Sequence, residues 1–164
     1  MTKQIRDWIR GIKESLVVNP GRVLEIGSLD VNGEVREFFP DANEYIGIDM
    51  QKGAGVDIVI NAHDIKKRFG ENSFDTVVCL EMLEHDNAFW LTLRNIKWVL
   101  KKGGFFICST PTINFPFHPY PKDYWRFTKE AYSDVIFKGY DLVKIDGVVD
   151  SEGSPGICAI GKKL

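Results

Sequence analysis

The chain has 164 residues, a formal net charge of −2 and a hydrophobic fraction of 44%. This length is enough for one domain with a sizeable core, and the composition excludes a disordered chain. The small charge gives no bulk electrostatic reason to bind nucleic acid or an anionic membrane. No apolar run approaches the ~20 residues needed to span a bilayer. We therefore predict a single domain over residues 1–164 with no membrane segment.

The cysteines and the first residues of the chain indicate the cellular compartment in which the protein is expected. Cys79, Cys108 and Cys158 lie far apart, each in an apolar strand-like run, which is typical of buried free thiols in a reducing environment. The first residues lead into a charged amphipathic segment, and no secretory signal is visible there. We therefore expect a cytoplasmic protein.

The first predicted element is a helix over residues 1–18. Apolar residues recur there at helical spacing, at Ile5, Trp8, Ile9, Ile12 and Leu16. The turn Asn19-Pro-Gly21 ends the helix. We expect it to cover one edge of the sheet or of a nucleotide site, and a partner-binding helix is the alternative.

The remaining elements alternate between strands and helices. Apolar runs bounded by turn residues predict strands over 22–26, 44–49, 56–60, 74–81, 105–109, 141–149 and 156–161. Helices are predicted over 34–39 and 86–101, the second with Gly103 as its C′ residue, and from Thr128 to about Lys138. This order predicts an α/β fold with a doubly wound, mostly parallel seven-stranded sheet. Its last two strands form an antiparallel pair at the edge.

The stretch from Arg22 to Gly33 has the form of the opening strand, loop and helix start of a nucleotide-binding fold. Asp49 ends the second strand, where such folds hydrogen-bond a ribose diol. Leu29 and Val31 stand where a dinucleotide site wants glycine, so the loop is poorly made for a pyrophosphate. An adenosine ligand without phosphates could still lie beside it, and S-adenosylmethionine is the obvious example.

Five segments carry a more specific pattern: Val23-Leu-Glu-Ile-Gly27, Tyr45-Ile-Gly-Ile-Asp49, Asn61-Ala-His-Asp-Ile65, residues 74–85 and Val99-Leu-Lys-Lys-Gly-Gly104. In this order and spacing they resemble the motifs of the class I, Rossmann-like S-adenosylmethionine-dependent methyltransferases. The resemblance covers almost the whole chain. One departure is Leu29, where the family usually has a second glycine.

The resemblance implies a role for four residues at the first two strands. Gly27 and Ser28 would lie against the cofactor, and Asp49 would accept hydrogen bonds from the ribose diol. Glu25 would help to bind the methionine end. The alternatives are a plain turn glycine, a surface acid at Asp49 and an acid at position 25 that only organises the loop.

Four further residues are implied for the rest of the cofactor. Asp64 would accept a hydrogen bond from the adenine amino group, while Ile65 and Met50 would pack on the ring. Glu81 would face the methionine and the sulfonium, where a carboxylate favours a cation. Asp64 as a helix cap, Met50 as core and Glu81 as a structural acid stay open.

The loop over residues 111–127 follows the fifth strand and resembles a segment of methyltransferases associated with glycan or small-molecule pathways. His118 and Asp123 could deprotonate or orient a hydroxyl acceptor. The predicted substrate-binding residues are Tyr120, Tyr124, Trp125 and Arg126. The alternative is a loop that packs on itself, with Arg126 paired to a buried acid.

A metal site is not expected from the spacing. Glu84-His85 would complete a His-x-x-Glu-His zinc motif only with histidine at position 81, where Glu81 stands. His63, His85 and His118 lie far apart in sequence. We predict no metal and expect His85 to pin the turn after the fourth strand.

Together these patterns predict S-adenosylmethionine-dependent methyl transfer to an unidentified acceptor, with a small hydroxylated or glycan-related molecule favoured. One alternative is a non-catalytic domain that binds S-adenosylmethionine or regulates a partner. Another is a nicotinamide-dependent oxidoreductase, against which the missing loop glycines count. There is no basic run and no Asn/Asp-Pro-Pro-Tyr/Phe signature of amino-methylating nucleic-acid enzymes, so nucleic acid is not an expected partner.

Overall fold

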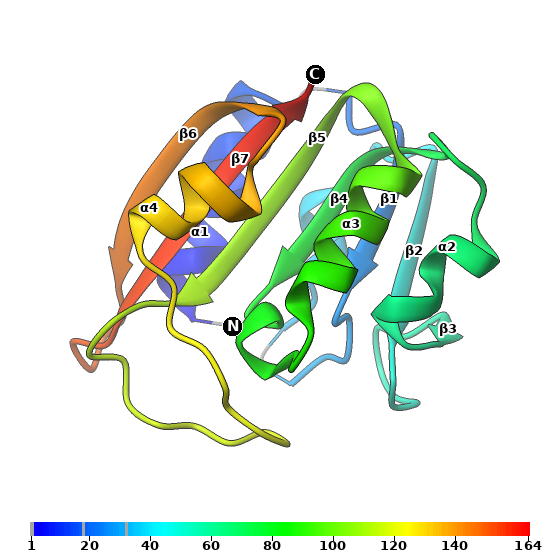
Figure 1. Cartoon of the computed structure of the whole chain (residues 1–164). Coiled ribbons are helices and arrows are strands. Elements are labelled where there is room, and N and C mark those ends of the chain that lie inside the picture. Colours follow the sequence, from blue (N-terminus) through cyan, green and yellow to red (C-terminus); the bar gives the residue numbers. More distant parts are fainter. Residues whose placement is uncertain (1, 18, 32) are drawn as a thin grey trace.

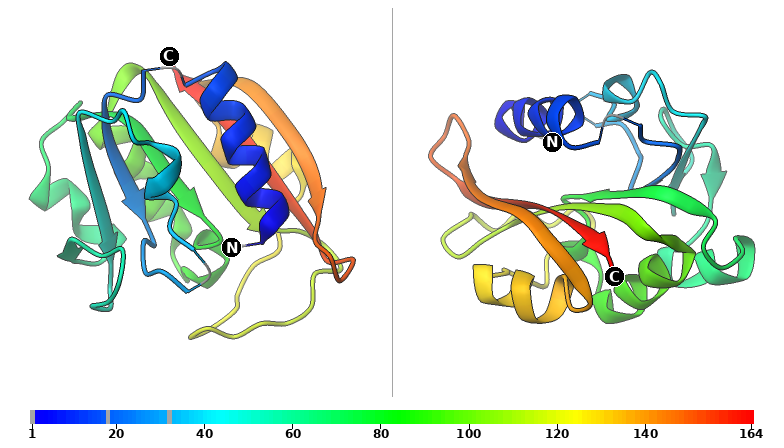
Figure 2. Two further views of the ribbon diagram at one scale, coloured as in Figure 1. Left: turned by 180° about the vertical axis from the view of Figure 1, so that it is seen from behind. Right: turned by 90° about the horizontal axis from the view of Figure 1, so that it is seen from above.

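One mixed β-sheet runs through the molecule and carries helices on both faces (Figures 1 and 2). The computed structural model describes residues 2–17, 19–31 and 33–164. The strands of this part are β1 (Arg22–Ile26), β2 (Glu44–Asp49), β3 (Ile58–Val59), β4 (Phe74–Leu80), β5 (Leu100–Pro111), β6 (Tyr140–Val149) and β7 (Pro155–Lys163). The helices and helical turns are α1 (Lys3–Ser15), η1 (Arg36–Phe38), η2 (Ala62–Asp64), α2 (Ile65–Arg68), η3 (Leu83–His85), α3 (Phe89–Val99), α4 (Lys129–Ala131) and η4 (Tyr132–Ile136).

The strand order is β3-β2-β1-β4-β5-β7-β6, and β1 to β5 are parallel. β7 runs antiparallel between β5 and β6. The predicted doubly wound sheet with an antiparallel edge is therefore confirmed. The chain moves outward from β1 to β3 and then crosses back to β4, so a topological switch point lies between β1 and β4. Ligands of such sheets bind outside the carboxyl ends of the strands at this point.

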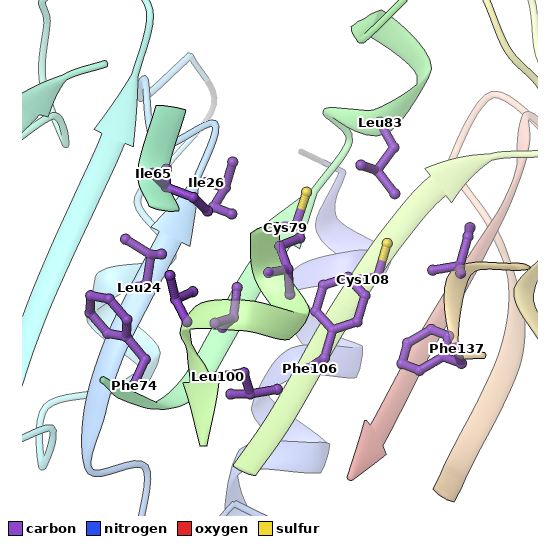
Figure 3. Packing of buried hydrophobic residues seen from close by; sticks show 14 of the residues in the cluster. Leu24, Ile26, Ile65, Phe74, Cys79, Leu83, Leu100, Phe106, Cys108 and Phe137 are labelled. Atoms are coloured by element: carbon purple, nitrogen blue, oxygen red, sulfur yellow. The ribbon is translucent and has the colours of Figure 1, made fainter. Parts of the chain in front are cut away.

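Each face of the sheet has its own buried core. One core joins the strands to α2, α3 and the α4–η4 segment, and the other joins them to α1 and η1. Figure 3 shows part of the first core, with Leu24, Cys79 and Phe106 on neighbouring strands. The middle strands are thus buried on both faces, which explains why their sequences are continuous apolar runs.

The helix α1 forms as the spacing predicts, and Ile5, Ile9 and Ile12 are its buried side chains. It lies over one face of the sheet, as Figure 2 shows. The Trp8 indole N–H also donates to Asp146 of β6, at 2.6 Å. The ends of the predicted range, residues 1 and 18, lie outside the described residues.

Two predicted elements are shorter in the structure. The predicted helix over 34–39 is only the 3₁₀ turn η1, because six residues before Pro40 are too few to stabilise an α-helix in isolation. The predicted strand over 56–60 pairs only at Ile58 and Val59. Just before that pairing, the Asp57 carboxylate accepts the Gly47 N–H at 2.7 Å, so this side chain occupies a backbone donor of β2.

The boundary between α3 and β5 also differs from the prediction. The helix begins at Phe89 because Asp86 precedes it in a turn, with its Oδ1 accepting the Ala88 N–H at 2.9 Å. β5 begins at Leu100, and Gly103 lies inside it with φ +76°, not at a helix end. The pairing of β5 with β4 changes register between Phe74 and Thr76. Gly103, with its positive φ, lies in the irregular part of β5 opposite this shift.

The last helix and the cysteines agree with the prediction. The Thr128 side chain accepts the Ala131 N–H and caps α4, which continues into the π-helical turn η4. Cys79, Cys108 and Cys158 are free and buried. Across residues 2–17, 19–31 and 33–164, none of the helices combines the length and apolar character needed to cross a bilayer.

The packing of α1 predicts the effect of one substitution. Ile9→Ala should lower the free energy of unfolding by about 2–5 kcal/mol, because it removes a fully buried side chain between helix and sheet. Glu14→Ala, on the exposed side of the same helix, should change it by less than about 0.5 kcal/mol. Urea denaturation measures both. An equally small effect of both substitutions would mean that α1 does not contribute to the core.

Candidate active site

A cavity of about 430 Å³ lies at the carboxyl ends of β1, β2 and β4, where the topology places the switch point. Its walls come from the segments that follow these strands and from the loop after β5. The lining residues used below are Gly27, Asp49, Met50, Asn61, Ala62, His63, Glu81, Met82, His85, Tyr120 and Tyr124.

Gly27 presents bare backbone to the cavity. It has φ +79°, and its N–H donates to the Ile48 carbonyl at 2.9 Å. A Cβ at this position would lie 2.9 Å from Met82 Cγ, so a side chain would push into the cavity wall. Ser28 follows it but is buried beneath the loop, and its side chain does not line the cavity. The pocket therefore contains the predicted Gly27 and not the Ser28 side chain.

Asp49 ends β2 in the cavity wall, next to the first loop. Its Oδ1 accepts the Gln51 N–H at 2.9 Å, and its Oδ2 lies 3.4 Å from the Leu29 nitrogen. Each carboxylate oxygen has two lone pairs, so both can still accept from a diol. Met50, the next residue, also lines the cavity.

Glu25 faces away from the cavity. Leu24 and Ile26 point into the core beneath α3, and side chains alternate along a strand, so Glu25 points to the opposite face. There it accepts a hydrogen bond from the Tyr45 hydroxyl at 2.8 Å. Burial raises the pKa of Glu25 to about 7. The structure therefore does not bring the predicted Glu25 to the cofactor side.

Asp64 and Ile65 are also outside the cavity. Asn61 begins η2 by accepting the His63 N–H at 2.8 Å, and this turn directs Asp64 outward to Lys67, at 2.6 Å. Ile65 is fully buried and packs near Ile26 (Figure 3). The cavity instead contains Asn61, Ala62 and His63, which the sequence interpretation did not include.

Glu81 lies in the cavity wall just after β4, with φ +50°. It accepts a hydrogen bond from the Ser109 hydroxyl at 2.8 Å. Burial, together with the nearby Glu84 carboxylate, raises the pKa of Glu81 to about 8. A positive charge in the cavity would favour its ionised form. Glu81 therefore lies in the cavity, and its contact with a cationic part of the ligand stays a prediction.

The loop between β5 and α4 lies at this same end of the sheet (Figure 1). Three hydrogen bonds tie it to the segment after β4. The Tyr124 N–H donates to the Glu84 carbonyl at 2.8 Å, and the Trp125 indole N–H donates to the Asp86 carbonyl at 2.9 Å. His85 Nδ1 lies 2.5 Å from the Lys122 carbonyl, so His85 helps to hold the loop and also lines the cavity.

Two predicted substrate residues hold the loop together instead. Trp125 packs edge-on against Phe89, with ring centroids 5.5 Å apart, and does not line the cavity. The Arg126 guanidinium grips both oxygens of Asp123 and donates to the Pro116 carbonyl at 2.9 Å. Arg126 is therefore paired to a buried acid of the loop, as the alternative expected, whereas Trp125 packs on α3. Tyr120 and Tyr124 line the cavity and are 62% and 43% exposed.

His118 and Asp123 lie together in this loop. The Asp123 side chain is 1% exposed and accepts the His118 backbone N–H at 2.9 Å, while its Oδ2 lies 3.3 Å from His118 Nδ1. The Arg126 guanidinium holds the pKa of Asp123 well below its usual range. Asp123 is therefore suited to orient His118 and not to accept a proton. Glu84, followed by Asp123, raises the pKa of His118.

The structure also brings together residues that are distant in sequence. Glu84 is fully buried, and its Oε1 lies 3.5 Å from His85 Nε2 and 3.7 Å from His118 Nε2. The sequence interpretation rejected a cluster here because the histidines are far apart. A usable signal was that Glu84-His85 and the loop carrying His118 both follow strands at the same edge of the sheet.

Comparison with known proteins identifies the family. The family model described as a methyltransferase domain matches residues 24–108, about half of the chain. A search of curated protein sequences gave no significant match.

Three solved structures are similar in fold. The 1,6-didemethyltoxoflavin-N1-methyltransferase of Burkholderia thailandensis, solved with bound 1,6-didemethyltoxoflavin and S-adenosylhomocysteine, has a TM-score of 0.81 at 16% identity, over 97% of this chain and 78% of that one. An S-adenosylmethionine-dependent methyltransferase from Archaeoglobus fulgidus has a TM-score of 0.74 at 17% identity, over 96% and 94%. A Haloferax volcanii putative methyltransferase, solved with the Trm112 methyltransferase activator, has a TM-score of 0.66 at 14% identity, over 99% and 98%.

The chain belongs to the methyltransferase domain family. It is a class I enzyme whose cofactor is S-adenosylmethionine, as the resemblance predicted. The cavity fits this cofactor for three reasons: Gly27 has no side chain to obstruct the ligand, Asp49 offers a carboxylate for a ribose diol, and Met50 offers an apolar surface.

The contrast between Asp49 and Asp64 gives a test of the cofactor site. Asp49→Ala should weaken S-adenosylmethionine binding by about 1–3 kcal/mol, because it removes charged hydrogen bonds in the cavity. Asp64→Ala should leave the affinity unchanged, since that carboxylate faces solvent and Lys67. Calorimetric titration of both variants checks this. A larger loss for the Asp64 variant would contradict the assignment.

The buried Glu25 predicts a pH dependence of stability. Its pKa is about 7 in the folded protein and near 4.5 in the unfolded chain, so the folded state retains a proton that the unfolded chain releases between these values. The free energy of unfolding should therefore fall by about 3 kcal/mol from this group as the pH rises through that window. Glu25→Gln should remove this decrease, and Glu14→Gln should keep it. Urea denaturation at pH values from about 4.5 to 7.5 measures the difference; parallel curves for wild type and Glu25→Gln would refute it.

Proposed function

We propose that the enzyme transfers a methyl group from S-adenosylmethionine to a hydroxyl oxygen of a small, flat or sugar-like acceptor. The observation that carries this proposal is a cavity whose open rim carries two tyrosines, with His118 packed against the cavity residue His85 at a ring-centroid distance of 5.0 Å. When bound, S-adenosylmethionine supplies a methyl carbon activated by a sulfonium leaving group. The protein then has to align the acceptor, exclude water and accept a proton.

Different residues of the cavity bind the ribose, the adenine and the sulfonium of the cofactor in this proposal. Asp49 accepts from the ribose diol, and Gly27 allows the first loop to lie against the ligand. Met50 and the Asn61-Ala-His63 turn provide the surface for adenine. Glu81, at the end of β4, favours the cationic sulfonium, since burial leaves its charge poorly compensated in the free protein.

The acceptor side is formed by the loop after β5. Tyr120 and Tyr124 present ring faces at the rim of the cavity, and such faces pack well on planar rings and on the apolar faces of sugars. The space that remains beside the cofactor is small, because the whole cavity measures about 430 Å³. A small acceptor therefore fits better than a polymer.

His118 is the group proposed to take the acceptor proton. Its Nδ1 lies 3.3 Å from Asp123 Oδ2 and its Nε2 lies 3.7 Å from Glu84 Oε1, so two carboxylates favour a proton on this ring. The Asp123 carboxylate is itself held by Arg126, which keeps it ionised and in place. This arrangement sets the ring orientation of His118.

A domain that needs a partner protein is the second candidate. Ile113 and Phe117 of the same loop are 57% and 73% exposed, which is unusual for large apolar side chains. One similar structure was solved with a methyltransferase activator. Tight S-adenosylmethionine binding with no turnover across a broad acceptor panel would favour this candidate over an independent enzyme.

The proposed function is tested by turnover of hydroxylated acceptors, followed through formation of S-adenosylhomocysteine. His118→Ala should lower kcat by about 10²–10⁴-fold, the usual contribution of general base catalysis, with little change in cofactor affinity. Phe117→Ala is the matched control in the same loop and should keep both values. An equal loss of turnover and cofactor affinity in His118→Ala would make His118 a structural residue.

A further inference from the structure

Three side chains that are separate in sequence converge beside the cavity: Glu84 and His85 of η3, and His118 of the loop after β5. One ligand atom from each can be chosen so that all three atoms lie within 4.8 Å of one another. Glu84 Oε1 lies 3.5 Å from His85 Nε2 and 3.7 Å from His118 Nε2. The cluster therefore has two imidazole nitrogens directed at one carboxylate oxygen.

The Glu84 carboxylate is the unusual member. It is fully buried, and within the described part of the chain neither of its oxygens has a hydrogen-bond partner. The two N···O separations are longer than the 2.7–3.2 Å typical of N–H···O hydrogen bonds. Buried charged groups are normally paired closely or bound to a metal, and a cation shared by the three side chains would compensate this carboxylate.

The other ring nitrogen of His85 shows where its proton lies. His85 Nδ1 is 2.5 Å from the Lys122 carbonyl, which can only accept, so Nδ1 carries the proton. His118 Nδ1 lies 3.3 Å from Asp123 Oδ2 but is a buried nitrogen that makes no hydrogen bond within the described residues. The Nε2 lone pair of His85 therefore faces Glu84 Oε1, and His118 Nε2 lies 3.7 Å from the same oxygen. Histidines that bind metals typically donate their other N–H to a carbonyl or a carboxylate, as His85 does.

The distances match a tetrahedral ion. Zinc binds imidazole nitrogen at 2.0–2.1 Å and carboxylate oxygen at about 2.0–2.2 Å, so two ligands of a tetrahedral ion lie roughly 3.3–3.5 Å apart. The observed separations of 3.5 and 3.7 Å are close to this spacing. Two histidines and one glutamate are also the ligands of one type of catalytic zinc site, which keeps a fourth position open.

We propose that Glu84, His85 and His118 bind a divalent transition-metal ion of the zinc class, with its fourth position open toward the cofactor cavity. Of the three ligands, His85 lines the cavity and Glu84 and His118 do not, so the ion would lie next to the cavity wall at His85. The site rests on the geometry of this chain, and its role in turnover rests on the proposed function. The sequence prediction that no metal binds is replaced by this proposal.

The ion would change the way in which the acceptor is activated. A hydroxyl bound at the open position has a lowered pKa and releases its proton to water. The oxygen lone pair then forms the O–CH₃ bond as the S–CH₃ bond breaks, and the bond's electron pair stays on sulfur. With the ion bound, His118 is a ligand and the ion replaces it in activating the acceptor, so the loss of turnover expected for His118→Ala would then come from loss of the ion.

The experiment is a titration of the untagged, metal-free protein with Co²⁺, followed by visible absorption, and with Zn²⁺ in competition. We expect one equivalent of Co²⁺ to give the intense absorption of a four-coordinate ion, and Zn²⁺ to abolish it. Glu84→Gln, His85→Ala and His118→Ala should each weaken Co²⁺ binding by more than about 100-fold, since loss of an outer partner alone costs 10–100-fold. Glu14→Gln, on the exposed side of α1 and outside the cavity, is the control and should keep the affinity.

The absence of saturable Co²⁺ binding, or binding that survives all three substitutions, would overturn the site. Glu84→Gln is isosteric, so it tests the cluster even if an alanine variant fails to fold, as circular dichroism would show. Calorimetry with S-adenosylmethionine measures the cofactor site independently. Binding of Co²⁺ without methyl transfer to any hydroxyl would refute the proposed function alone. Undiminished turnover after removal of the ion with dipicolinate would refute its role in activation.

Discussion

The parallel alignment of β1, β2 and β4 is the constraint on which the site depends. Parallel strands bring their carboxyl ends to one edge of the sheet, and the crossover from β3 to β4 leaves room between the segments that follow β1 and β4. Gly27, Asp49 and Glu81 are all residues at or just after a strand end. They meet in one cavity because the hydrogen-bond register of the sheet aligns Ile26 with both Ile48 and Cys79.

Three buried or partly buried glutamates differ in the groups that surround their carboxylates. Glu25 accepts a hydrogen bond from the Tyr45 hydroxyl on the face of the sheet that α1 covers, and it does not line the cavity. Glu81 is held by Ser109 and faces the cavity. Glu84 has two imidazoles directed at it at distances longer than hydrogen bonds. Burial disfavours the charge of each carboxylate, and the groups around it decide whether a proton, a cationic ligand or a metal ion compensates.

The loop after β5 joins these parts. Its backbone and side chains are anchored to the segment after β4 through Tyr124, His85 and Trp125, while Arg126 and Asp123 stabilise its own shape. This internal scaffold leaves Tyr120 and Tyr124 at the rim and places His118 beside Glu84. The loop is therefore a preorganised wall of the site, held by hydrogen bonds at several points along its length.

Much of the fold and part of the site could be predicted from the sequence. Hydrophobic periodicity identified all the strands, since a strand buried on both faces must be a continuous apolar run. Strand-end position placed Gly27, Asp49 and Glu81 at the cavity, because the ends of parallel strands converge, and their contacts with the cofactor stay predictions. The resemblance also implied Glu25 and Asp64, but the alternation along β1 directs Glu25 to the other face and the turn begun by Asn61 directs Asp64 outward.

The sequence by itself thus determined the class of sheet, the family and the residues whose position in a strand decides their surroundings. Only the tertiary structure decided which side chains of the long loop pack inward, and that His118 reaches Glu84 and His85. The physical reason is that periodicity and turn chemistry are local, whereas these contacts depend on how a loop folds back onto a distant strand end. Hydrogen bonds such as Tyr124 to Glu84 and Trp125 to Asp86 set that geometry, and no spacing along the chain encodes them.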